Sequence, residues 1–126
     1  MPSQLLCHHK GTILATVVAV AGTGATMGVG VRVGAGVEVG DNAVIYSNVV
    51  AEHDCRIDAH AYLSPGVILS GAVKVETGAF IGAGAVVLPS LTVGKDANVA
   101  AGAVVVSDVR AGDVVMGLPA KSRHSR

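Results

Sequence analysis

Residues 49–87 read VVAEHDCRIDAHAYLSPGVILSGAVKVETGAFIGAGAVV, and this stretch decides the fold. An aliphatic residue or an alanine returns at every sixth position, at Ala51, Ile57, Leu63, Leu69, Val75, Ile81 and Val87. The same phase continues back to Val33 and forward to Val105 without a miss. A six-residue period is typical of the parallel β-helix, in which each hexad forms one short strand and one corner and three hexads complete a coil. The sequence therefore predicts an all-β parallel β-helix.

The residue two positions before each aliphatic is restricted as well, and is valine, alanine, cysteine or leucine throughout the array. Two inward positions per hexad would fill a narrow prism with small side chains. This agrees with a hydrophobic content of 51% beside an aromatic content of only 2%. A helical interpretation conflicts with the period, with the many β-branched residues and with the 17 glycines.

The 126 residues include nine basic and nine acidic residues, so the formal net charge is zero. A balanced charge offers no basic face to a phosphate backbone, and we expect no nucleic-acid partner. The two cysteines, Cys7 and Cys55, do not make a disulfide framework and fit a reducing, cytoplasmic setting. Cys55 falls at an inward position, so we expect a small buried hydrophobic residue there.

The uncharged stretch 11–31 allows two interpretations. It could be an export signal with Lys10 as its basic flank. It could instead be an early coil, because Ala21 and Met27 extend the six-residue phase backward, and we favour this interpretation. We therefore expect a tail over 1–10, one β-helix domain over 11–121 and a basic tail over 122–126. We expect no membrane partner.

The aromatic residues of the chain are few and should lie together. Because three hexads make one coil, residues 18 apart should stack at the inter-strand spacing of roughly 4.8 Å. This puts Tyr62 directly beneath Phe80 and brings Tyr46 to the same edge. Exposed rings that fill no core usually cover a partner or a ligand. A protomer interface and a ligand contact both remain open for this edge.

Glu52-His53-Asp54 is the one place where a histidine is flanked on both sides by carboxylates, and it falls at a corner. A histidine can take a proton from an incoming amine or hydroxyl, and a neighbouring carboxylate raises its basicity and fixes its tautomer. One coil above, Gly71 could bring a backbone N–H close to a ligand and stabilise an oxyanion. The alternative interpretation is a solvated turn with no catalytic role.

The remaining histidines do not predict a metal site. His60 falls on a different corner from His53, so the two cannot share one metal within a single chain. His8, His9 and His124 belong to the expected tails. We therefore expect no metal in this protein.

Several stretches resemble the hexapeptide-repeat acetyltransferases. They are VVAEHDC at 49–55, LSPG at 63–66, IGAGAVV at 81–87 and GLPAK at 117–121. Within that family the resemblance is strongest to the sialic-acid O-acetyltransferases and the N-acetyltransferases of UDP-4-amino sugars, and it covers about residues 11–121. It implies a left-handed coil, a homotrimer with its active sites between protomers, and acetyl-CoA as co-substrate.

The resemblance also implies roles for individual residues. His53 would be the general base, Asp54 the acid that raises its basicity, and Gly71 the source of the oxyanion N–H. Tyr46 would lie where the family holds its substrate. The expected contacts with acetyl-CoA are at Tyr62, Ala83, Ala101 and, at the far end of the cofactor, Lys121.

The chain departs from its relatives in three ways. Tyr46 stands where these enzymes typically have an asparagine, and Tyr62 stands where many have a second histidine. We also expect the chain to lack their N-terminal nucleotide-binding domain. We expect an acetyl-CoA-dependent acetyltransferase that acts on an amine or hydroxyl of a small-molecule sugar or sugar nucleotide. The alternative is a non-catalytic trimeric β-helix scaffold, or a truncated relative that has lost its acceptor site.

Overall fold

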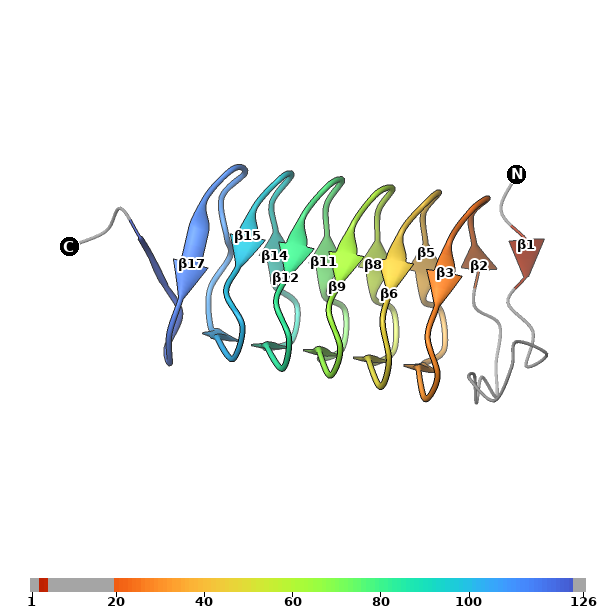
Figure 1. Ribbon diagram of the computed structural model, residues 1–126, viewed down its shortest axis with the longest axis horizontal. Coiled ribbons are helices and arrows are strands. Elements are labelled where there is room, and N and C mark those ends of the chain that lie inside the picture. The colour runs from red at the N-terminus through yellow and green to blue at the C-terminus, as the bar shows by residue number, and fades with distance from the viewer. Residues whose placement is uncertain (1–2, 5–19, 124–126) are drawn as a thin grey trace.

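The computed structural model describes residues 3–4 and 20–123, and these residues form strands and turns. Strands of two or three residues alternate with corners, and successive coils stack side by side into a prism (Figure 1). Strands β1 (Ser3–Gln4) and β17 (Val114–Met116) lie at opposite ends of this prism (Figure 1). The predicted all-β parallel β-helix is confirmed. The described part of the chain contains no helix long and apolar enough to cross a membrane.

The strands form three sheets, one on each side of the prism. Sheet A contains β1 (Ser3–Gln4), β2 (Val20–Ala21), β5 (Glu38–Val39), β8 (Arg56–Ile57), β11 (Lys74–Val75) and β14 (Thr92–Val93). Sheet B contains β3 (Thr26–Met27), β6 (Val44–Ile45), β9 (Tyr62–Leu63), β12 (Phe80–Ile81), β15 (Asn98–Val99), β17 (Val114–Met116) and β18 (Lys121–Ser122). Sheet C contains β4 (Arg32–Val33), β7 (Val50–Ala51), β10 (Ile68–Leu69), β13 (Val86–Val87) and β16 (Val104–Val105).

Strands of neighbouring coils pair in parallel at a spacing of 18 residues, as three hexads per coil require. Ile68, for example, pairs with Val50 in the coil before and with Val86 in the coil after. The spacing shortens in the last coil, where Asn98 pairs with Val114. The six-residue period therefore predicts the register throughout the array and fails only where the period itself ends.

The ends of the expected domain are described in part. The start expected at residue 11 lies outside the described residues, as do most of the two expected tails. Within those tails, Ser3–Gln4 forms β1, which pairs antiparallel with β2. Ser122 belongs to β18, which pairs antiparallel with β17. Both described pieces therefore add a strand at an end of the prism.

Both inward series fill the centre of the prism. The aliphatic positions from Val33 to Val105 are all buried, and so are their partners two residues earlier, apart from Leu91, which is half-buried. Cys55 is buried as expected, and burial raises the pKa of its thiol. Its Sγ donates a hydrogen bond to the carbonyl oxygen of Ser70 at 3.1 Å. The thiol thus acts as a small packing group with a satisfied donor.

Each corner of the array contains a residue with a positive φ. Every sixth residue from Gly24 to Gly102 lies in this left-handed region. Glycine, asparagine and aspartate fill most of these positions, because they adopt the conformation at the lowest cost. Asp54 has a φ of 59°, and Ala72, one coil later, has the same value. The corners are therefore set by residue choice as well as by the buried series.

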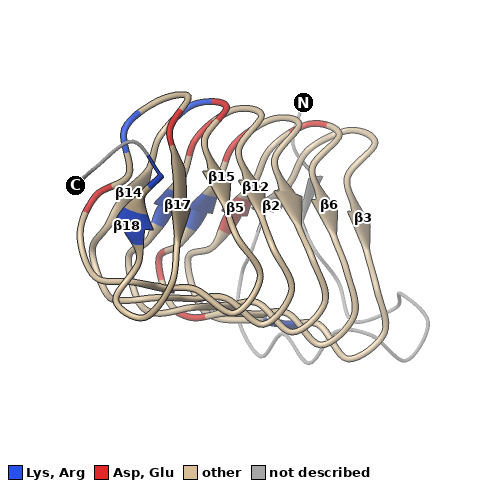
Figure 2. Cartoon of the chain, turned by 60° about the vertical axis from the view of Figure 1, so that its left-hand side comes forward, with Lys and Arg blue, Asp and Glu red and all other residues tan. Residues whose placement is uncertain are grey.

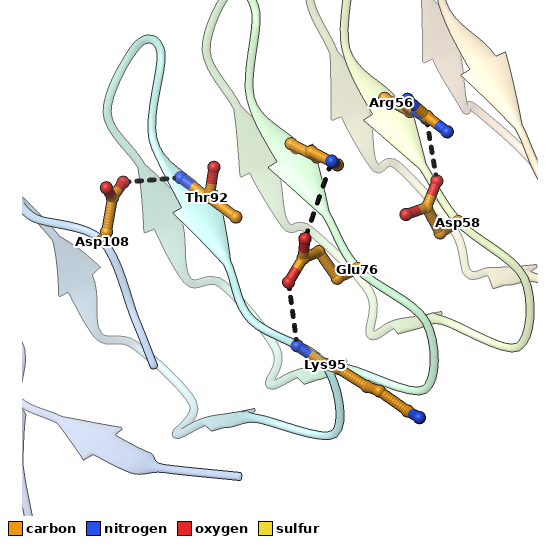
Figure 3. A network of polar contacts seen from close by, with 7 residues as sticks. Arg56, Asp58, Glu76, Thr92, Lys95 and Asp108 are labelled. Atoms are coloured by element: carbon orange, nitrogen blue, oxygen red, sulfur yellow. Dashed lines mark hydrogen bonds and ion pairs between the residues drawn. The ribbon is translucent and has the colours of Figure 1, made fainter. Parts of the chain in front are cut away.

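The outer face of sheet A is charged. Its outward strand positions include Glu38, Arg56 and Lys74, and Figure 2 shows β5 in red. These charges pair locally, with Arg56 Nε 3.0 Å from Asp58 and Lys74 Nζ 3.6 Å from Glu76 (Figure 3). Exposed pairs of this kind contribute little to stability, but they keep this face compatible with water.

The outer faces of sheets B and C are apolar by comparison. Sheet C begins with an exposed Arg32 in β4 and then presents Val50, Ile68, Val86 and Val104 in register from coil to coil, and Ile68 is 41% exposed. Sheet B presents its aromatic side chains. Exposed apolar surface of this extent usually covers another molecule.

Candidate active site

The His53–Asp54 corner joins β7 of sheet C to β8 of sheet A. Asp54 takes the left-handed position, which aspartate tolerates better than most residues, and His53 directly precedes it. Their side chains are 65% and 68% exposed, respectively. A molecule arriving from solvent can therefore reach either side chain without any movement of the coil.

The two side chains contact each other in a way that fixes the histidine. His53 Nδ1 lies 3.1 Å from Asp54 Oδ2. An ionised carboxylate can only accept hydrogen bonds, so Nδ1 must carry the proton in this contact. Nε2 then keeps its lone pair when the imidazole is neutral. The corner thus presents a histidine in the tautomer that a general base needs.

The imidazole of His53 lies across the Cα of Gly71, one coil later. A Cβ atom on Gly71 would stand 2.6 Å from Cε1 and 3.1 Å from Cδ2 of the ring, with Nε2 as the nearest atom of all. No side chain fits there while the ring keeps its place. The stacking of Gly71 over His53 that the period predicts is therefore present, and the free nitrogen is the part of the ring that lies against Gly71.

The backbone at Gly71 also offers a donor. No hydrogen bond from the Gly71 N–H occurs within the part of the chain that the structure describes, whereas the N–H groups of Ser70 and Ala72 donate to carbonyls of neighbouring coils. The N–H groups of Ala83 and Ala101, at equivalent positions, are likewise unpaired among the described residues. What distinguishes Gly71 is the histidine ring beside it. An unpaired N–H at that place can bind a developing oxyanion.

Other residues predicted from sequence lie elsewhere on the chain. Tyr46, Ala83 and Ala101 lie at the corner between sheets B and C, Tyr62 lies on sheet B, and Lys121 lies in β18. The His53 corner, by contrast, lies between sheets C and A. The outer face of sheet C separates the two corners, so one chain does not bring all the predicted site residues together.

The aromatic residues form a ladder across β9 and β12. The ring centroids of Tyr46 and Tyr62 lie 5.1 Å apart at 56°, and those of Tyr62 and Phe80 lie 4.9 Å apart at 19°. A hydrogen bond with Tyr46 is the main cause that raises the pKa of Tyr62, with partial burial adding to it. The predicted stacking of these rings is confirmed. Phe80, which is 38% exposed, belongs to the ladder although no site role was assigned to it from sequence.

A cavity of about 580 Å³ opens at the C-terminal end of the prism, lined by residues that include Val105, Asp108, Arg110 and Lys121. Of the site residues predicted from sequence, only Lys121 lines it. The six-residue phase ends at Val105, so the period gave no signal for this cavity. Among the described residues, no three histidine, cysteine, aspartate or glutamate side chains are grouped to hold a metal ion.

Comparison with protein-family models matches the hexapeptide repeat of succinyl-transferase over residues 22–51 and 72–107. Among solved structures, the acetyltransferase domain of PglB from Neisseria gonorrhoeae, in complex with acetyl coenzyme A, is 35% identical with a TM-score of 0.81, over 91% of this chain and 59% of that chain. A mutant of GDP-perosamine N-acetyl transferase from Caulobacter crescentus, in complex with CoA and GDP-perosamine, is 37% identical with a TM-score of 0.84, over 93% and 55%. WeeI from Acinetobacter baumannii is 31% identical with a TM-score of 0.82, over 90% and 55%.

The chain thus spans 55% to 59% of the length of these solved chains. No curated protein matches the sequence. The family model nevertheless covers more than half of the chain, and the solved structures agree with it over almost the whole prism. The protein therefore belongs to the hexapeptide-repeat transferases, and its described coils form a left-handed parallel β-helix.

Proposed function

We propose that the protein transfers the acetyl group of acetyl-CoA to an amine or hydroxyl of a sugar or sugar nucleotide, through a catalytic domain that spans 11–121. The observation that carries the proposal is the His53 imidazole, whose Nδ1 contacts Asp54 and whose Nε2 lies against Gly71. Solved relatives support the co-substrate and the acceptor class, since one holds acetyl coenzyme A and another holds CoA with GDP-perosamine.

The reaction needs one base and one oxyanion donor. The acceptor amine or hydroxyl approaches Nε2 of His53, which takes its proton as the nitrogen or oxygen attacks the thioester carbonyl. The carbonyl oxygen becomes an oxyanion and accepts a hydrogen bond from the Gly71 N–H. Collapse of this intermediate breaks the carbon–sulfur bond, and the CoA thiolate takes the proton from the His53 imidazolium. Asp54 stabilises that imidazolium throughout.

The remaining predicted residues would bind the two substrates. Tyr62, Ala83 and Ala101 would contact acetyl-CoA, and Lys121 would lie near its far end. Tyr46 would contact the acceptor. We assign the protein to the cytoplasm, because its chain has few cysteines and Cys55 is a free thiol.

The proposed assembly is a homotrimer with its active sites between protomers. Sheet A is charged, whereas sheets B and C both present apolar side chains, so two of the three faces suit contact with another copy. A second copy would also account for the separation of the His53 corner from Ala83 and Ala101. Cofactor contacts from one protomer would then meet the base of the next.

The decisive test of the activity is His53→Ala, assayed for acetyl transfer across a panel of amino sugars and nucleotide-linked sugars. We expect kcat to fall by about 10²- to 10⁴-fold, the usual contribution of a general base. The matched control is His60→Asn, because His60 is another exposed corner histidine and asparagine suits its φ of 62°. That variant should keep full activity.

Two results would contradict the proposal. If His53→Ala transferred the acetyl group at the wild-type rate, His53 could not be the general base. Absence of acetyl-CoA binding by the wild-type chain in a calorimetric titration would favour the non-catalytic scaffold instead.

The trimer has a separate test. Ile68→Glu puts a charge at the centre of the apolar face of sheet C, and we expect monomers by analytical ultracentrifugation. Thr92→Glu makes a similar change on sheet A and should leave the trimer intact. A wild-type monomer at working concentration would rule the assembly out.

A further inference from the structure

The prism contains a repeated contact between a corner residue and a glycine one coil earlier. At Asn42, Asn48, Asp54 and Asp96, φ is positive and the side-chain Oδ1 lies against the Cα of a glycine. The corresponding glycines are Gly24, Gly30, Gly36 and Gly78. A Cβ on any of these glycines would collide with that oxygen. The missing side chain therefore makes room for the oxygen above it.

At the Asp54 contact, the second carboxylate oxygen also accepts a hydrogen bond. Asp54 rests its Oδ1 on Gly36 and accepts the His53 Nδ1 hydrogen bond with its Oδ2. The residues that precede the other three members are aspartate, serine and lysine, so the arrangement with a histidine occurs only at Asp54. Gly36 thus contacts the one carboxylate that fixes the tautomer of the proposed base.

We propose that Gly36 is a positioning residue for His53, acting through the Asp54 carboxylate. The proposal rests on the proposed function, in which His53 is the base. With glycine at position 36, the Oδ1 of Asp54 packs directly against the preceding coil, and its Oδ2 accepts the hydrogen bond from His53 Nδ1. A methyl group at position 36 would lift the carboxylate and weaken that contact, so Nε2 would more often carry the proton and could not accept one.

A Gly36→Ala chain should fold. The added Cβ would meet the far end of a flexible side chain, and the next atom, Asp54 Cγ, would be 3.4 Å away. Alanine also occupies the same column of corners at Ala72 with a φ of 59°, so the coil accepts it in the left-handed region. The cost should be a modest loss of thermal stability, as for any left-handed alanine.

Gly78→Ala is the matched control. Gly78 has a φ of 73° against 74° for Gly36, and a Cβ there would likewise collide with an aspartate Oδ1 and lie 3.4 Å from the Cγ of Asp96. Lys95 precedes that aspartate, so no histidine depends on it. Both variants should lose the same thermal stability, and only Gly36→Ala should affect the site.

The test combines the tautomer with the kinetics. The tautomer of His53 is read from ¹⁵N NMR spectra of the free full-length protein, at a pH where the ring is neutral. We expect the Nδ1–H form to dominate in the wild type and in Gly78→Ala, and to lose population in Gly36→Ala. The kcat of Gly36→Ala should fall by about 10- to 100-fold, with KM for acetyl-CoA unchanged, as part of the general-base contribution. In an Asp54→Asn background, Gly36→Ala should add no further loss of kcat.

The proposal would be overturned if Gly36→Ala had the same His53 tautomer population and the same kcat as Gly78→Ala. A further loss of kcat on top of Asp54→Asn would overturn it as well, because the effect would then not pass through the carboxylate. The tautomer measurement needs no substrate, so it tests Gly36 even if His53→Ala shows that the proposed function is wrong.

Discussion

The corner at His53–Asp54 and the corner at Lys95–Asp96 have the same backbone and different chemistry. In both, an aspartate takes the left-handed position, with φ of 59° and 56°, and covers a glycine one coil earlier. At the first, a histidine ring lies on Gly71. At the second, the Lys95 backbone N–H donates to Glu76 at 3.2 Å (Figure 3). The repeat thus supplies the shape of a corner, and a histidine below a glycine supplies the group that we propose as the base.

Of the substitutions that would remove this difference between the two corners, Gly71→Ala should have the largest effect. Its Cβ would occupy the place of the His53 ring, so the ring must turn away from the donor N–H. We expect kcat to fall by about 10²- to 10³-fold, comparable to the loss of an oxyanion donor. Stability should change little, because Ala35, Ala59 and Ala83 occupy the same place in other corners. Steady-state kinetics and thermal unfolding measure the two effects.

The control for Gly71→Ala is the same substitution in a His53→Ala background. If the methyl group acts by displacing the ring, the double variant should be no slower than His53→Ala alone. A full additional loss would mean that the substitution acts on substrate binding or on the backbone instead.

Asp54→Asn should have a smaller effect on kcat than Gly71→Ala, and Asp96→Asn is its matched control. Asparagine already fills the same corner position at Asn42 and Asn48, so both variants should keep the fold. The amide at position 54 can donate to Nδ1 and favour the unproductive tautomer, as in a catalytic triad that has lost its aspartate. We expect kcat to fall by about 10- to 100-fold, less than in a buried triad because water competes at an exposed pair. Equal activity of the two variants would assign Asp54 to the turn alone.

The geometry of the corner could be predicted from sequence because the period has no interruption. A spacing of 18 put Gly71 over His53 and Tyr62 beneath Phe80, and the structure has both contacts. The same spacing separates Gly36 from Asp54, but this signal was missed, since glycine and aspartate are common in turns of any kind. The left hand of the coil came from family resemblance, because the usual crossover rule favours the opposite hand.

The burial and register predicted from the sequence are less accurate where the six-residue period ends. Leu91 was expected to be an inward residue and is half-buried. The bridge between Val93 and Val109 shifts the last coil by two residues, which sets Ser107 rather than an aliphatic over Leu91. The sequence after Val105 carries no repeat that could have shown this shift, nor the cavity that opens beside it.

The smallest expected effect concerns strain beside Gly71. Ala72 is exposed and has a φ of 59°, a conformation that costs alanine about 1–2 kcal/mol. Ala72→Gly removes this strain but adds freedom to the unfolded chain, worth about 0.4–1 kcal/mol, so we expect a net stabilisation of up to about 1.6 kcal/mol. Ala83 is at a corner position without a positive φ. Ala83→Gly therefore only adds freedom to the unfolded chain and should destabilise the protein. Opposite shifts in thermal unfolding are the expected result, and destabilisation by both variants would mean that the corner above His53 is unstrained.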